Sequence, residues 1–170
     1  MKALAEHGLY PSWISGTSAG SMVAALYAAG CSIREMEKIA MSLNGGIYDT
    51  DYIGIVMGVL QWILTKDTKW DGIIKGKNLE MLMKKLTKDK YMFESKIPLA
   101  ITAVDINTGM TVMFVSSKRG LYNDRHTIYM EDVPIYEAVR ASIAIPVVFK
   151  PKILNGMRLV DGGVTETIPV

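Results

Sequence analysis

Apolar residues recur every three or four positions in three segments of the chain, which is the spacing of a helix with one buried face. These segments cover residues 22–29, 33–43 and 79–86. The first ends at Gly30, a common helix stop, and the second begins with the capping-box sequence SIRE at residues 32–35. The pattern therefore predicts three helices, each with one apolar face.

Runs of β-forming residues indicate strands elsewhere in the chain. Residues 99–104 and 111–115 are separated by the turn-forming sequence DINTG, so we expect two neighbouring strands there. Shorter strands are expected at residues 13–14 and 158–160, and a short helix at residues 136–145. Because helices and strands alternate without an internal repeat or a low-complexity linker, the sequence predicts an α/β domain.

The composition fits one globular domain over residues 1–170. Hydrophobic residues make up 49% of the chain, which is enough to form a core. The 19 basic and 17 acidic residues give a net charge of +2, and this balance argues against nucleic acid as the main partner. Since Cys31 is the only cysteine, no intrachain disulfide or cysteine-rich metal site can form, and we expect a reducing, cytoplasmic setting.

The chain contains no stretch that is typical of an export signal or a membrane-spanning helix. Glu6 and His7 interrupt the apolar residues near the start, and the most apolar segment, residues 53–64, is shorter than the roughly 20 residues that cross a bilayer. Trp62 and the lysines that follow fit a helix lying on an anionic membrane surface. They fit equally a buried helix followed by a solvated basic loop.

The sequence GTSAGS places Ser18 between Gly16 and Gly20. A predicted strand precedes this motif and a predicted helix follows it, which is the setting in which a G-x-S-x-G turn exposes a nucleophilic serine. Small flanking residues let the chain pass closely through such a turn. The same pattern is also found in structural turns, so the chemistry depends on whether a base lies near the Ser18 hydroxyl group.

Two histidines are available as that base. His7 lies at the end of a short predicted helix, just before Gly8, and is expected to be a surface residue. His126 lies in the polar run YNDRHT, which predicts an exposed loop. Together with Asp105, His126 would follow Ser18 in the Ser, Asp, His order of α/β-hydrolases.

Asp161 is the stronger candidate for the base. It ends the predicted strand in the sequence VDGG, where Gly162 and Gly163 allow another chain segment to approach. The alternative interpretation of the same residues is an ordinary Asp-Gly turn.

Four blocks of the sequence become specific when they are taken together. GTSAGS at residues 16–21, YAAG at 27–30, EAVRASIAIP at 137–146 and LVDGGV at 159–164 occur in this order. As a set they resemble the patatin-like phospholipase family. The resemblance implies a three-layer α/β/α sandwich with a mainly parallel central sheet.

The resemblance also implies a reaction and its catalytic residues. Ser18 would be the nucleophile and Asp161 its base in a two-residue dyad that hydrolyses phospholipids or other lipid acyl esters through an acyl-enzyme, without a metal or cofactor. Because a carboxylic acid with a pKa of about 3.9 is a weak base toward an alcohol, we expect Asp161 to be buried. The backbone amide of Ala19, at the start of the helix, is the expected donor to the oxyanion.

Two departures from the family limit this expectation. The G-G-G-x-[RK]-G block that supplies oxyanion donors in the family does not occur in the chain, and Thr167 stands where the family often has asparagine. We therefore expect a partial domain, truncated at both ends and lacking the first strand, with low activity by itself. Residues 45–90 would form a helical lid or cover. A silent lipid-binding or regulatory module, and a Ser-Asp-His esterase using His126, are the alternatives.

Overall fold

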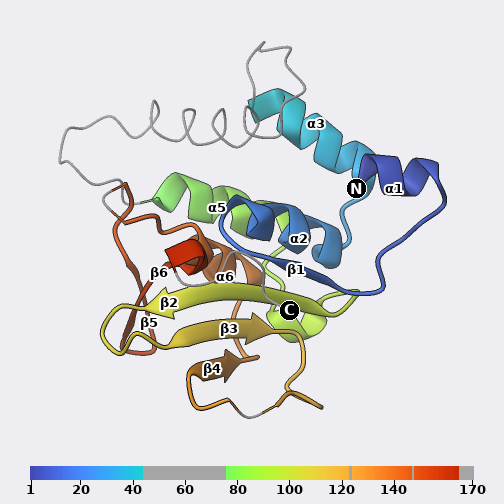
Figure 1. The fold of residues 1–170 in the computed structure, drawn as a ribbon. Helices are drawn as coiled ribbons and strands as arrows, with labels where there is room; N and C mark the ends of the chain where they lie inside the picture. The colour runs from blue at the N-terminus through green and yellow to red at the C-terminus, as the bar shows by residue number, and fades with distance from the viewer. Residues whose placement is uncertain (44–75, 123, 147, 165–170) are drawn as a thin grey trace.

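The computed structural model describes residues 1–43, 76–122, 124–146 and 148–164 (Figure 1). Within these residues, six strands form one sheet with the order β4-β3-β2-β6-β5, and β1 pairs with β2 beside β6. The strands are β1 (Ile14–Gly16), β2 (Leu99–Asp105), β3 (Thr111–Val115), β4 (Thr127–Met130), β5 (Lys152–Leu154) and β6 (Met157–Asp161). Strands were predicted at β1, β2, β3 and β6, whereas β4 and β5 were not.

The helices predicted from periodicity are confirmed. They are α2 (Ala19–Ala29), α3 (Ile33–Leu43), α5 (Lys77–Leu86) and α6 (Ile135–Ser142), with α1 (Lys2–Glu6) at the start of the chain and the 3-10 helices η1 (Met92–Glu94) and η2 (Gly162–Val164). Gly30 ends α2 in the left-handed region with φ 99°. Ser32 and Glu35 form the expected capping box, with the Ser32 amide 2.7 Å from Glu35 Oε2.

The sheet is mixed in strand direction. β1 pairs with β2 and β3 with β4 in parallel, whereas β2–β3, β2–β6 and β5–β6 are antiparallel. The α/β class is confirmed, but the described strands are not mainly parallel as expected. The physical reason is that short connections join β2 to β3 and β5 to β6, and a parallel pair needs a crossover of a dozen residues or more.

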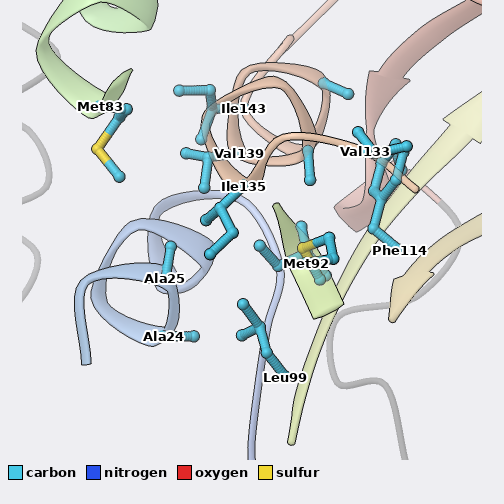
Figure 2. Close-up of a cluster of buried hydrophobic side chains, with 14 of the residues drawn as sticks. Ala24, Ala25, Met83, Met92, Leu99, Phe114, Val133, Ile135, Val139 and Ile143 are labelled. Carbon is cyan, nitrogen blue, oxygen red and sulfur yellow. The ribbon is translucent and has the colours of Figure 1, made fainter. Parts of the chain in front are cut away.

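The core lies between the sheet and the helices α2 and α6 (Figure 2). Leu99, Ile101 and Ala103 alternate along β2 and face this core. Ile135 and Val139 of α6 lie close to the buried alanines of α2, and α5 packs against α6. This packing fixes the ends of α2 and α6 relative to the strands that carry the predicted site residues.

Several predictions concern residues outside the described part of the chain. They include the apolar segment at residues 53–64, Trp62, Thr167 and most of the predicted lid over residues 45–90. Only the end of that lid region is described, and it contains α5. Among the described residues, no helix is long and apolar enough to span a bilayer.

Candidate active site

Ser18 lies at the turn between β1 and α2. Its backbone has φ 53° and ψ −130°, a combination that residues other than glycine rarely adopt. Such a conformation costs about 1–3 kcal/mol and persists only where surrounding contacts hold it. The turn is tight, because a Cβ atom added to Gly16 would lie 2.6 Å from the carbonyl oxygen of Gly20. Gly20 itself has open space around its own Cβ position.

The side chains of Ser18 and Asp161 are joined by a hydrogen bond. Ser18 Oγ donates to Asp161 Oδ2 over 2.6 Å, although 143 positions separate the two residues in the chain. β1 and β6 both pair with β2, so the sheet brings the end of β1 and the end of β6 together. Asp161 is buried as expected, with 6% of its surface exposed.

The turn after Asp161 packs directly against β2. Asp161 Oδ1 accepts a hydrogen bond from the Gly163 amide over 2.8 Å, so both carboxylate oxygens are engaged. A Cβ atom on Gly162 would lie 2.5 Å from Thr102 Oγ1 and 2.7 Å from the Thr102 carbonyl oxygen. Thr102 Oγ1 also lies 2.7 Å from Thr17 Oγ1, in the Ser18 turn. Thr102 therefore connects the two loops that carry Ser18 and Asp161.

Two serines contact the backbone of Ser18. Ser142 Oγ accepts a hydrogen bond from the Ser18 amide over 2.9 Å, and Ser21 Oγ donates to the Ser18 carbonyl oxygen over 2.5 Å. Both side chains are fully buried. The block containing Ser142 is one of the four that carry the family resemblance, but sequence reasoning did not single out Ser142, Ser21 or Thr102. For Thr102, the available signal was that it is a polar residue in a buried strand.

The structure does not bring His126 to Ser18. His126 is exposed, and its backbone bonds Asp124 and Thr111 at the start of β4, on the far side of β3 from β2. Neighbouring strands lie about 4.8 Å apart, so this position is about 10 Å from β2 and farther from β1. A hydrogen bond between His126 and Ser18 requires about 3 Å. His7 is exposed at the end of α1, where its ring bonds the Ala3 carbonyl oxygen.

Asp105, the partner considered for His126, is hydrogen-bonded to its own turn and to β6. Its carboxylate accepts hydrogen bonds from the Thr108 hydroxyl group and from the amides of Asn107 and Arg158. Burial acts to raise the pKa of Asp105, but these hydrogen bonds outweigh it and the pKa lies below its ordinary value. Asp105 therefore has a structural role in the turn after β2.

The start of α2 has the electrostatics needed to stabilise an oxyanion. Ala19 is the first residue of α2, so its amide precedes the donors that bond within the helix. The partial positive charge of a helix N-terminus favours negative charge near this amide. Among the described residues, no cluster of three or more potential metal-binding side chains occurs.

A cavity of about 370 Å³ lies at the opposite end of α2 from Ser18. Its lining includes Ala29, Cys31, Ile39 and Leu86, together with lysines of α3, α5 and the turn after α5. Because α2 has 11 residues, this end of the helix is about 16 Å from Ser18. The cavity is therefore separate from the Ser18 and Asp161 pair.

Comparison with known proteins identifies the class to which this fold and site belong. The model of the patatin-like phospholipase family matches residues 1–170, and the chain belongs to that family. The similarity extends to uncharacterized protein YqhO of Bacillus subtilis, which is 27% identical over 179 residues, covering 99% of this chain and 59% of that protein.

Two further relatives are an uncharacterized NTE family protein of Mycobacterium tuberculosis and an intracellular phospholipase A2 of Caenorhabditis elegans. The first is 26% identical, covering 100% of this chain and 39% of that protein. The second is 27% identical, covering 94% of this chain and 13% of that protein. The chain thus spans less than two thirds of the length of these curated relatives.

Proposed function

We propose that the chain is the catalytic region of a serine lipid acyl hydrolase of the phospholipase A or lysophospholipase type, with Ser18 as nucleophile and Asp161 as base. The hydrogen bond of 2.6 Å between Ser18 Oγ and Asp161 Oδ2 carries the proposal. A nucleophile within hydrogen-bond reach of its base is the arrangement that covalent catalysis requires. Membership of the patatin-like phospholipase family supports the lipid ester substrate.

The proposed reaction has two steps. Ser18 Oγ attacks the ester carbonyl carbon while its proton moves to Asp161 Oδ2, and the proton then passes to the departing alcohol as the ester bond breaks. Water attacks the resulting acyl-enzyme, gives a proton to Asp161 and releases the fatty acid, and Ser18 Oγ regains its proton. The Ala19 amide donates to the oxyanion in both steps.

The substrate is a phospholipid or another lipid acyl ester, presented to the enzyme by the surface of a membrane in the cytoplasm. The NTE family relative and the phospholipase A2 relative support a lipid substrate. Since this chain spans only part of the length of the curated relatives, the activity is proposed for the full-length gene product.

A fluorophosphonate probe tests the nucleophile directly, because it phosphonylates an activated serine without needing the natural substrate. We expect the full-length gene product to be labelled at Ser18 and to hydrolyse a short-chain p-nitrophenyl ester. Ser18→Ala should abolish both. His126→Ala serves as the matched control and should change neither, because His126 lies far from the turn.

The outcomes separate the alternatives. A folded full-length protein that is not labelled at Ser18 would favour a silent lipid-binding or regulatory module. A severe loss of turnover in His126→Ala, with Ser18 still required, would favour a Ser-Asp-His esterase. Neither result is expected if Asp161 is the base.

A further inference from the structure

The backbone of Ser18 is held on both sides by contacts that the proposed reaction does not use. On the carbonyl side, the Ser21 amide and hydroxyl group both donate to the Ser18 carbonyl oxygen, over 3.0 and 2.5 Å. These bonds lie within the first turn of α2 and form locally. On the amide side, the partner is the Ser142 hydroxyl group, 124 positions away in the chain.

Ser142 is the last residue of α6, and the turn that follows it also contacts the strand of the base. The Asp161 amide donates to the Ala144 carbonyl oxygen over 3.0 Å. Residues 142–144 thus bond the backbone of Ser18 through one residue and the backbone of Asp161 through another. Because both Ser142 and Ala144 are fully buried, these bonds are shielded from competing water.

The turn is itself rigidly placed. Ile135 and Val139 of α6 are fully buried in the core between α2 and the sheet (Figure 2). A buried helix end that bonds two separate loops fixes the separation of those loops, because its own position is set by close packing. The separation that matters here is the one between Ser18 Oγ and Asp161 Oδ2.

We propose that Ser142 is a positioning residue for the nucleophile: its hydroxyl oxygen accepts the Ser18 amide and thereby holds Ser18 in the conformation that aims Oγ at Asp161. This inference rests on the proposed function of Ser18. Ser142 does not touch the substrate in this role. Its bond also occupies the Ser18 amide, so the Ala19 amide is left as the oxyanion donor at this turn.

Ser142→Ala removes the acceptor and leaves the surrounding core residues unchanged. A displacement of about 1 Å at a reacting group costs on the order of 100-fold in rate, so we expect kcat to fall by about 10- to 100-fold with KM changed less than about 2-fold. The rate constant for fluorophosphonate labelling of Ser18 should fall by a similar factor. Ser142→Thr keeps the hydroxyl oxygen and should recover most of the labelling rate.

Ser116→Ala is the matched control, measured in the same full-length gene product. Ser116 Oγ accepts the Leu99 amide over 3.0 Å, so this variant also deletes a serine acceptor for a backbone amide, but at the beginning of β2. We expect Ser116→Ala and Ser142→Ala to lower Tm by similar amounts, and only Ser142→Ala to lower kcat and the labelling rate.

The outcomes distinguish this inference from the proposed function. The positioning role alone would be overturned if the unsubstituted protein is labelled at Ser18 and Ser142→Ala has the same kcat and labelling rate. The same would follow if Ser116→Ala lost as much labelling rate as Ser142→Ala, or if Ser142→Thr folded normally but behaved like Ser142→Ala. An unsubstituted protein that is never labelled would overturn both proposals.

Discussion

Asp105 and Asp161 are both buried aspartates that end neighbouring, antiparallel strands, yet their surroundings differ. Asp105 accepts hydrogen bonds from three residues. These bonds stabilise the turn after β2 and the contact of Asp105 with β6. Asp161 accepts one backbone amide, and its other oxygen faces the Ser18 hydroxyl group. Burial alone therefore does not mark a base. What distinguishes Asp161 is that one of its donors is the hydroxyl group of Ser18, the proposed nucleophile.

The largest difference between the two aspartates should be in activity. Asp161→Asn removes the proposed base and should lower kcat for a p-nitrophenyl ester by about 10²- to 10⁴-fold, which is the usual contribution of a general base. Asp105→Asn should leave kcat of the folded protein within about 2-fold of the unsubstituted value. Steady-state kinetics of both variants at 25 °C make the comparison. Equal losses in the two variants would contradict the assignment of Asp161 as base.

A smaller effect is expected from the glycine that follows Asp161. Gly162→Ala would place Cβ 2.5 Å from Thr102 Oγ1, and relieving such an overlap costs about 1–3 kcal/mol of unfolding free energy. Asp161 should shift with its turn, so activity should fall as well. Gly20→Ala is the matched control, because no atom lies within 4 Å of its Cβ position. Urea unfolding of Gly162→Ala and Gly20→Ala measures the change in unfolding free energy. An unchanged midpoint for Gly162→Ala would contradict the close packing against β2.

The smallest effect concerns stability and pH. The pKa of Asp105 is lowered in the fold, so its ionised form stabilises the protein above the unfolded pKa of about 3.9, and this contribution is lost as pH falls below that value. Asp105→Asn should cost about 1–3 kcal/mol at pH 7. Its Tm should also fall less steeply than that of the unsubstituted protein between pH 5 and pH 3.

Asp124→Asn provides the control for this measurement. Asp124 accepts the His126 amide and the Thr127 hydroxyl group in a similar turn, and these bonds lower its pKa, but the turn lies near the surface. We expect a smaller change in Tm than for Asp105→Asn. A Tm profile of Asp105→Asn that runs parallel to the unsubstituted profile down to pH 3 would show that Asp105 contributes no pH-dependent stability.

Local patterns predicted those parts of the fold that are determined locally. The helices α2 and α3 followed from apolar spacing and from the Gly30 and Ser32 end signals, and both are confirmed. The strand β5 was missed, although Asn155 and Gly156 form a common hairpin turn and have φ values of 48° and 79°. That turn makes β5 and β6 antiparallel, and the expectation of a mainly parallel sheet did not take it into account.

The site could be predicted only in part. A turn exposing Ser18 followed from the strand and helix around it, whereas the pairing of Ser18 with Asp161 was an implication of the family resemblance. No spacing rule connects residues 143 positions apart, because their distance depends on how β1 and β6 both pair with β2. Ser142 was out of reach for the same reason, since its contact with Ser18 exists only after α6 has packed.

The separation of Ser18 and Asp161 along the chain also has a consequence during protein synthesis. Ribosomes add about 5–20 residues per second, so Ser18 is made roughly 7–30 s before Asp161. Until β6 has been synthesised and has paired with β2, the Asp161 carboxylate is not beside the serine. If Ser18 is the nucleophile as proposed, we therefore expect a nascent chain to stay unreactive toward lipid esters until β6 is in place.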